Sequence, residues 1–469
     1  MLVAGGGPAG LAAAADAAAA GLAVGLVDER VALGGQIFKQ PGPGCEVRDP
    51  HALGPDHVRG RRLIDAAVAS GARVLLRTAV VAVKGEAVVL VAEGEHARTV
   101  TARRLLLAAG AHDRPVAFPG WTLPGVLTAG GAQTLVKTQR VLPGDRMAFA
   151  GSGPLALAFP AQLHGYGAGV ALVLEAGPAP RAGDVARMLA AAPGNAGLLR
   201  DAARYRGRLL RARIPLRYRR IVVRAEGDGR VESVTHAAVD ADWRVIAGTE
   251  ETVAADVLCV GYGFVASVEL ARLAGCALAY DEDRGGPVVM VDEWMRTTVP
   301  GVLAAGDGTG VDGSHVAVDE GRLAAIGAAL ELGRIDETGA RRTAAAIRRR
   351  LARKRAFARA LRPMHRVGPG LYELADHDTV VCRCEEVRRA ELDEAIATSP
   401  DPGVVKALTR AGMGLCQGRN CQRQVAAMIA ARYGGAVAEV PQATPRLPAR
   451  PVALAAMAQA PDHDLGLFQ

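Results

Sequence analysis

Four cysteines near the C-terminus have the residue type and the spacing of metal ligands. Cys382 and Cys384 form a CxC pair, and Cys416 and Cys421 form a CxxxxC pair. Four thiolates can hold either a zinc ion or an iron–sulfur cluster. Because structural zinc sites typically use CxxC-like pairs, this spacing favours a [2Fe–2S] cluster with these four cysteines as ligands. A zinc site and four free thiols are the alternatives.

Basic side chains accompany both cysteine pairs and would offset the negative charge of a thiolate-ligated cluster. They are Arg383, Arg410 and Arg419. Cys45, Cys259 and Cys276 have no partner at a useful spacing, so we expect them in the core or in loops. No redox-active cysteine pair interrupts the nucleotide motifs described next, so dithiol relay chemistry is not expected.

A glycine-rich turn at the start of the chain has the spacing of a dinucleotide-binding motif. It reads Gly5-Gly-Gly7-Pro8-Ala9-Gly10, between a short apolar strand and an alanine-rich helix. The first glycine of the motif allows a sharp turn, the second lets a pyrophosphate approach the backbone, and the third lets the helix pack closely on the strand. The positive end of the helix then faces the phosphates. The sequence therefore predicts a βαβ unit that binds a dinucleotide.

Later segments should return to the same nucleotide. The strand Leu22–Val27 ends at Asp28 and Glu29, where a carboxylate can hold ribose hydroxyls, although an acid there could also merely end the strand. Small residues in two further turns permit close backbone approach to the nucleotide. These turns are Gly35-Gln36 and Ala109-Gly110.

A third polar position follows a buried apolar strand that ends at Gly306 and Asp307. A carboxylate there can hydrogen-bond a polyol, and the alternative role of Asp307 is a helix cap. The next helix, predicted over Ser314–Leu330, would direct its N-terminus at the electron-rich side of a flavin ring. His112 and Asp113 lie near the expected flavin edge. The sequence shows no convincing acid–base pair or nucleophile, so we assign no catalytic residue.

The same order of motifs occurs a second time. Gly151-Ser-Gly153-Pro-Leu-Ala156 is a second dinucleotide turn, its following strand ends at Glu175, and an apolar strand reaches Gly263. This internal repeat is more specific than either turn alone. The second site could hold NAD or ATP, or it could be a scaffold that has lost its ligand. An arginine-rich insertion, Pro178–Arg220, could cover a nicotinamide site.

Length and charge limit the other classes of function. A chain of 469 residues is long enough for two to four domains. The net charge of +8 suggests a nucleic-acid partner, but arginine is spread along the chain and no aromatic-interleaved basic patch occurs, so no nucleic-acid partner is expected. The basic run Arg341–Arg362 reads as a helix with a structural or inter-subunit role, or one that contacts phosphate or a membrane surface.

Targeting segments and cysteine usage indicate the compartment. No signal peptide is visible, and no run of about 20 apolar residues occurs, so we expect no membrane span. Seven cysteines with four of them crowded together do not suggest a secreted disulfide framework. We therefore expect a cytoplasmic protein that at most lies peripherally at the inner membrane.

Together these motifs resemble the α (A) subunits of bacterial flavin-dependent amine and imino-acid dehydrogenases, a family that includes the subunits of opine oxidase, hydrogen cyanide synthase and proline or hydroxyproline dehydrogenase. The resemblance spans nearly the whole chain. Its specific part is the cysteine block, which is similar to bacterioferritin-associated-ferredoxin-like (BFD-like) domains that carry [2Fe–2S]. The chain departs from the family pattern at Ala109, where a threonine is usual before the glycine.

The resemblance implies an α/β fold with two dinucleotide-binding (Rossmann-like) domains of glutathione-reductase type and a small helical [2Fe–2S]-binding domain. The expected boundaries are residues 1–117 with 285–340 for an FAD-binding domain and 118–284 for the second dinucleotide-binding domain. A helical linker over 341–375, the cluster domain over 376–435 and a Pro/Ala-rich tail over 436–469 should follow.

The resemblance also implies partners. A separate catalytic flavoprotein β subunit would oxidise an opine, proline, hydroxyproline or glycine, with or without a small ferredoxin-like or γ subunit. This chain would then relay electrons through FAD and the cluster to a quinone or dye-type acceptor. Two alternatives remain open: a stand-alone NADH-dependent flavin and iron–sulfur oxidoreductase, and a scaffold subunit with a structural nucleotide in the second site.

Overall fold

The first glycine-rich turn belongs to a five-stranded parallel sheet. The computed structural model describes residues 1–45, 47, 49, 53–92 and 96–459, so the last part of the expected tail, 460–469, lies outside it. The strand order is β20–β7–β1–β2–β3, with the N-terminal strand in the centre. The strands are β1 (Leu2–Ala4), β2 (Gly25–Val27), β3 (Arg73–Leu75), β7 (Leu105–Leu107) and β20 (Val302–Ala304).

Helices cover this sheet because their small apolar residues allow close packing. Helix α1 (Pro8–Ala19) contacts both α2 (Pro55–Ala69) and α8 (Ser314–Glu331). A Cβ on Gly321 of α8 would lie 2.1 Å from the carbonyl oxygen of Ala9, so the two helices meet almost backbone to backbone. Next to them is an antiparallel sheet of β4 (Thr78–Lys84), β5 (Ala87–Ala92) and β6 (His96–Thr101).

The second glycine-rich turn belongs to another five-stranded parallel sheet, of order β12–β11–β10–β16–β9. Its strands are β9 (Val126–Thr128), β10 (Met147–Gly151), β11 (Val170–Glu175), β12 (Leu216–Tyr218) and β16 (Val257–Gly261). The helices of this half are α3 (Ala129–Gln133), the π-helix η2 (Thr134–Gln139), α4 (Pro154–Gly165), α5 (Ala182–Ala190) and α6 (Ala196–Arg211). An antiparallel sheet of β13 (Arg220–Glu226), β14 (Ser233–Ala238) and β15 (Glu251–Ala254) flanks it.

The two halves are joined by short strands between their sheets. Strand β8 (Ala111–Asp113) leaves the first half and pairs antiparallel with β17 (Phe264–Ala266), which returns from the second. Beyond β17, the chain packs into the core of the first sheet, which we expected it to rejoin only at residue 285. This returning segment comprises α7 (Glu269–Leu273), β18 (Leu278–Asp281), η3 (Glu282–Arg284) and β19 (Gly286–Val289). The short helix η4 (Asp307–Thr309) follows β20.

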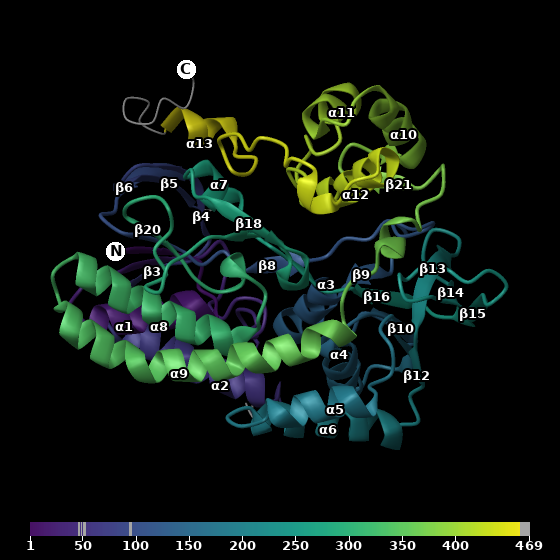
Figure 1. Ribbon diagram of the computed structural model, residues 1–469, viewed down its shortest axis with the longest axis horizontal. Coiled ribbons are helices and arrows are strands. Elements are labelled where there is room, and N and C mark those ends of the chain that lie inside the picture. The colour runs from purple at the N-terminus through teal and green to yellow at the C-terminus, as the bar shows by residue number, and fades with distance from the viewer. Residues whose placement is uncertain (46, 48, 50–52, 93–95, 460–469) are drawn as a thin grey trace.

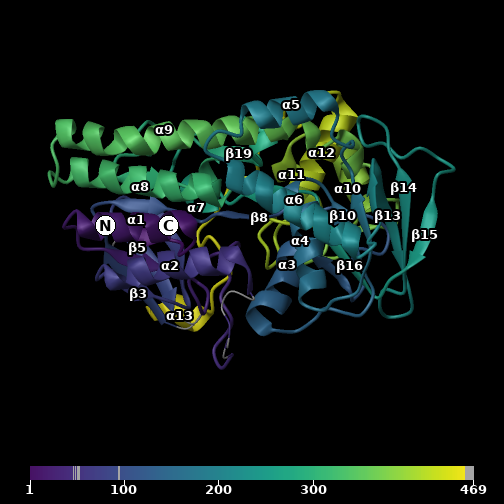
Figure 2. The ribbon, with the colours of Figure 1, turned by 90° about the horizontal axis from the view of Figure 1, so that it is seen from below.

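The expected basic helix is α9 (Glu337–Leu361), which lies alongside α8 on one flank of the molecule (Figures 1 and 2). Its basic residues have a structural role, since Arg350 and Lys354 pair with Asp319 of α8 at 2.8 and 2.7 Å. Asp319 is almost fully buried, so these cations neutralise a carboxylate inside the helix pair. No helix among the described residues combines the length and the apolar character that crossing a bilayer requires.

The C-terminal cysteine domain lies at the upper right in Figure 1, above the second half of the molecule. Two short helices, η5 (Arg362–Met364) and η6 (Pro369–Tyr372), lead into it. It contains the hairpin β21 (Val380–Cys382) and β22 (Val387–Arg388), then α10 (Arg389–Thr398), α11 (Pro402–Thr409) and α12 (Gln422–Tyr433) around a small apolar core. The tail continues through η7 (Val437–Glu439) to α13 (Leu454–Gln459).

Candidate functional site

One continuous cavity of about 1190 Å³ runs along the carboxyl ends of both sheets. It is lined by most of the residues that the sequence predicted for the nucleotides, together with one cysteine. These residues are Gly5, Gly7, Pro8, Ala9, Asp28, Glu29, Gly35, Gln36, Ala109, Gly110, Gly306, Asp307, Gly153, Ala156, Glu175 and Cys416. Gly10 and Gly151 lie behind the lining, where they allow close packing.

The first glycine turn forms a cradle at one end of this cavity. A Cβ on Gly10 would lie 1.8 Å from the carbonyl oxygen of Gly5, so helix α1 could not approach the strand with a larger residue there. Gly35 faces Gly7 from the opposite loop, and its Cβ would come within 2.8 Å of the Gly7 Cα atom. These bare backbone segments at a helix N-terminus fit a pyrophosphate.

The carboxylate of Asp28 holds the glycine turn from the end of β2. Its two oxygens accept hydrogen bonds from the N–H groups of Gly6 at 2.7 Å and Arg30 at 2.8 Å. Burial raises the pKa of Asp28 even though these bonds favour the charged form. Glu29 is more exposed and forms an ion pair with Arg450 from the C-terminal tail. Both acids border the cavity, as the sequence predicted for the ribose end.

Asp307 follows β20 and lies at the wall of the cavity, near the N-terminus of α8. Burial raises its pKa to about 7, and the charges of Glu320 and Asp312 add to the increase. Glu320 is fully buried and braces the turn, since it accepts hydrogen bonds from the Gly306 N–H at 2.8 Å and the Thr309 hydroxyl at 3.0 Å. Arg355 of α9 contacts its other oxygen at 2.7 Å.

The second turn repeats the bracing of the first. Glu175 accepts hydrogen bonds from the N–H groups of Gly153 at 3.0 Å and Gly177 at 2.8 Å, and burial raises its pKa to about 7. The short helix after α9 comes close above this turn. The imidazole of His365 lies 3.7 Å from where a Gly153 Cβ would be, and a Gly177 Cβ would lie 2.4 Å from the carbonyl oxygen of Met364.

The four predicted cysteine ligands come together in two pairs. The Cys382 thiol lies beside that of Cys421, and the Cys384 thiol lies beside that of Cys416. The neighbouring Cys421 thiol lowers the pKa of Cys382 to about 6, and backbone N–H groups act in the same direction. Among the described residues, no group of three or more ligand side chains is arranged around one point for a single metal ion. Four thiols in two pairs supply the number of ligands that a [2Fe–2S] cluster requires.

The cysteine loop reaches the nucleotide cavity. Leu415, Cys416 and Arg419 line it together with the residues that the sequence predicted for a dinucleotide. His112 also lines this cavity, and burial lowers the pKa of its imidazole, while the backbone of Arg419 acts in the opposite direction. Two of the arginines expected to offset cluster charge are already paired with carboxylates, Arg419 with Glu269 at 3.0 Å and Arg410 with Glu385 at 2.8 Å.

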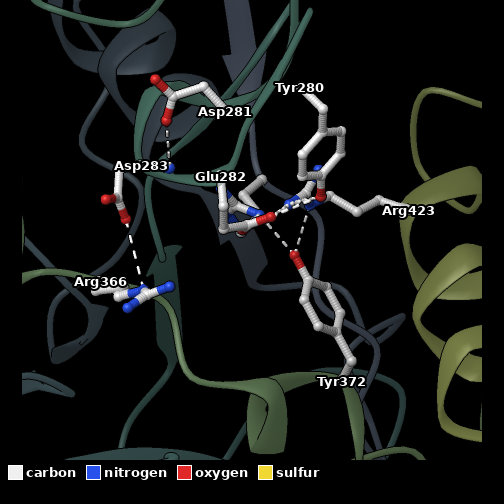
Figure 3. A network of polar contacts seen from close by, with 8 residues as sticks. Tyr280, Asp281, Glu282, Asp283, Arg366, Tyr372 and Arg423 are labelled. Atoms are coloured by element: carbon white, nitrogen blue, oxygen red, sulfur yellow. Dashed lines mark hydrogen bonds and ion pairs between the residues drawn. The ribbon is translucent and has the colours of Figure 1, made fainter. Parts of the chain in front are cut away.

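A buried polar network fixes the cysteine domain on the rest of the chain (Figure 3). The Tyr372 hydroxyl accepts hydrogen bonds from Arg114 at 2.6 Å and from Arg423 of α12 at 2.8 Å. Arg423 is also paired with Glu282, which lies between β18 and β19. Arg114, Glu282, Tyr372 and Arg423 come from four separate segments, so the network sets the position of the cysteine loop relative to the nucleotide cavity.

Sequence reasoning missed these supporting residues. His365, Tyr372, Arg423 and Arg450 are far in sequence from the residues that they contact, whereas Glu320 lies 14 residues beyond Gly306. The sequence signals were two adjacent carboxylates, Asp319 and Glu320, in an alanine-rich helix and arginines near the cysteines, and neither identifies a partner.

Comparison with known families identifies the class of the protein. Residues 1–321 match the family described as pyridine nucleotide-disulphide oxidoreductase, and residues 380–431 match the BFD-like [2Fe-2S] binding domain. The glycine cradle at the first turn fits a dinucleotide such as FAD, and the paired thiols fit a [2Fe–2S] cluster. The protein is therefore an FAD-dependent oxidoreductase with a C-terminal [2Fe–2S]-binding domain, and the predicted fold class is confirmed.

Comparison with individual relatives identifies the family more specifically. The HcnB subunit of hydrogen cyanide synthase from Pseudomonas aeruginosa is 36% identical over 430 residues, which cover 90% of both chains. The A subunit of opine oxidase from Agrobacterium tumefaciens is 34% identical over 480 residues, covering 98% of this chain and 92% of that one. The crystal structure of L-proline dehydrogenase from P. horikoshii has the same fold, with a TM-score of 0.66, 22% identity, and 96% of this chain and 78% of that chain covered. The chain belongs to the family of HcnB and the opine oxidase A subunits, as the sequence motifs predicted.

Proposed function

We propose that the chain is the electron-transfer subunit of a multi-subunit amine or imino-acid dehydrogenase. The observation that carries this proposal is the position of Cys416, which lines the same cavity as the flavin-site residues. A flavin takes up two electrons and can release them singly, whereas a [2Fe–2S] cluster carries one. A chain with both sites facing one cavity is suited to convert two-electron oxidation into one-electron steps.

In this proposal, the residues of the chain bind the two cofactors, orient them and shield them from water. The cradle of Gly5, Gly7 and Gly35 holds the FAD phosphates, Asp307 and the N-terminus of α8 bind the flavin side, and the four cysteines ligate the cluster. His112 and Arg419 line the cavity between the proposed flavin site and the cysteine loop. None of these residues has to act as a nucleophile, which agrees with substrate oxidation on another chain.

The relatives are named as subunits of an opine oxidase and of a hydrogen cyanide synthase, so we propose that the partner is a catalytic flavoprotein β subunit. Its substrate would be an opine, proline, hydroxyproline or glycine, and the acceptor a quinone or dye. A small ferredoxin-like or γ subunit would complete some assemblies. We place the complex in the cytoplasm, peripherally at the inner membrane where a quinone accepts the electrons.

An anaerobic absorption spectrum of the purified chain, with and without NADH, tests the proposal. We expect flavin bands and a broad cluster absorption that NADH leaves unchanged and that the β subunit with its substrate bleaches. Failure of the β subunit to reduce either cofactor would contradict the relay.

A stand-alone NADH-dependent oxidoreductase is the second candidate, because the cavity also reaches the second turn at Gly153 and Glu175. Bleaching by NADH within seconds would favour it. His365 and Met364 restrict the space over that turn, which argues against a reacting NAD there and leaves a structural nucleotide such as ATP, or no ligand, as the alternatives. If the nucleotide were structural and the chain a scaffold, removing the cluster would abolish assembly of the complex and leave electron transfer unchanged.

A further inference from the structure

The C-terminal tail returns from the cysteine domain to the first nucleotide-binding half (Figure 1). It is fixed there at successive points. The carbonyl oxygen of Ala443 accepts a hydrogen bond from the Arg272 guanidinium at 2.8 Å, and the N–H of Ala449 donates to the Val81 carbonyl at 2.7 Å. Ala456 is fully buried in an apolar cluster with Val81 and Val89. The tail is therefore packed structure over residues 443–456.

The tail crosses one particular end of the nucleotide cavity. Ala449 and Arg450 line the cavity together with Glu29 and Thr78, and Arg450 forms an ion pair with Glu29. In a dinucleotide-binding domain, the acid at the end of the second strand marks the adenosine ribose, while the glycine turn marks the pyrophosphate. Arg450 is therefore at the adenosine end of the first site.

The acids at this end are already engaged. Both oxygens of Asp28 accept backbone hydrogen bonds, and Glu29 is held by Arg450. The guanidinium of Arg450 is planar, carries five donors, and can both stack on an aromatic base and hydrogen-bond oxygens. Because 38% of the Arg450 side chain is exposed, a ligand in the cavity can reach it.

We propose that the tail forms part of one wall of the first nucleotide site through Ala449 and Arg450, and that Arg450 binds the adenosine portion of the cofactor. The tail, which the sequence presented only as a Pro/Ala-rich extension, is then part of the FAD-binding site. This inference rests on a dinucleotide in the first site and is independent of the electron relay.

The chemical difference between FAD and FMN tests the proposal, because FMN lacks the AMP portion of FAD, which includes the adenosine. Apoprotein would be titrated with FAD, FMN and ADP for the wild type, for Arg450→Ala and for a chain that ends at Val440. Arg446→Ala is the matched control, since Arg446 is an exposed arginine of the same tail that does not line the cavity. We expect the shortened chain to bind FAD and ADP at least about tenfold more weakly and Arg450→Ala about threefold more weakly, with FMN affinity unchanged in both.

Unchanged FAD affinity, or an equal loss for FAD and FMN, would overturn the proposal. Iron content and cluster absorption should stay at the wild-type level, which separates this result from damage to the cysteine domain and from failure of the relay.

A second measurement covers the case in which the shortened chain does not fold. Hydrogen exchange would be followed in peptides spanning residues 443–456 of the full-length apoprotein. FAD and ADP should slow exchange there at least about threefold, including at the Ala449 N–H, and FMN should not. Equal exchange with and without FAD would overturn the proposal.

Discussion

The carboxylate of Glu175 accepts a hydrogen bond from the N–H of Gly153 at 3.0 Å, in the second copy of a relationship that Asp28 has with Gly6 in the first. In each copy, the acid at the end of the strand also accepts a hydrogen bond from the N–H two residues further on. The two acids thus fix the backbone conformation of the glycine turns. This bracing role is additional to the contact with ribose that the sequence predicted.

The raised pKa of Glu175 predicts a pH-dependent stability. Its pKa is about 7 in the folded protein against an ordinary 4.5, so the folded state binds a proton between these values that the unfolded state does not. The unfolding free energy should therefore fall as pH rises from 4.5 to 7, by about 3 kcal/mol for this group. Glu175→Gln should flatten that slope in urea unfolding at pH 5 and pH 8. Glu250→Gln, an exposed acid of the same domain, should keep the wild-type slope.

The paired thiols predict that one cysteine can be lost without loss of the flavin. Cys416→Ser removes one ligand of the cluster, so iron content and cluster absorption should fall while the flavin bands persist. The β subunit with its substrate should still bleach the flavin, but electron transfer to a one-electron dye should slow by at least about tenfold. Cys45→Ser, at an exposed cysteine outside the cysteine domain, should change neither absorption nor rate. Full dye reduction by Cys416→Ser would contradict the proposed route.

The buried pair of Glu320 and Arg355 predicts a stability effect at the Gly306 turn. Arg355→Ala leaves a fully buried carboxylate without its cation, which should cost about 2–3 kcal/mol, below the usual 3–5 because Arg355 is partly exposed. Thermal unfolding of the apoprotein measures this loss. Arg349→Ala, on the exposed face of the same helix, should unfold within about 0.5 kcal/mol of wild type. An equal effect of both variants would show that the pair does not stabilise the turn.

The network around Tyr372 predicts a change in communication between the two cofactor sites. Tyr372→Phe removes the hydroxyl that Arg114 and Arg423 share, so the cysteine domain should be held less firmly. Flavin and iron contents should be unchanged, while the flavin-to-cluster rate in stopped-flow absorption should fall by about threefold or more. Tyr433→Phe is the control, because its hydroxyl bonds to Ile396 within the cysteine domain. If the control slows electron transfer equally, the network has no special role.

The sequence predicted the parts of this site that depend on local spacing. A glycine turn, an acid at the end of a strand and a cysteine pair each require only neighbouring residues, so Gly5–Gly10, Asp28 and Cys416 could be placed from their patterns. The helix predicted over Ser314–Leu330 is observed as Ser314–Glu331 for the same reason.

The remaining contacts join residues far apart in the sequence. His365 over Gly153 and Arg450 beside Glu29 depend on how a linker and a tail cross the sheets, and no local pattern encodes such a crossing. The return of the chain to the first sheet core near Ala266 also depends on the pairing of β17 with β8.

The place of β20 in the first sheet has a consequence for biosynthesis. This edge strand pairs with β7 and carries Gly306 and Asp307, yet it follows the whole second half in the chain. On the ribosome, the second half is a contiguous segment and can fold as soon as it emerges, whereas the first sheet must wait with an open edge until β20 has been made. The proposed FAD site is therefore completed late in translation, and cofactor loading should follow synthesis of both halves.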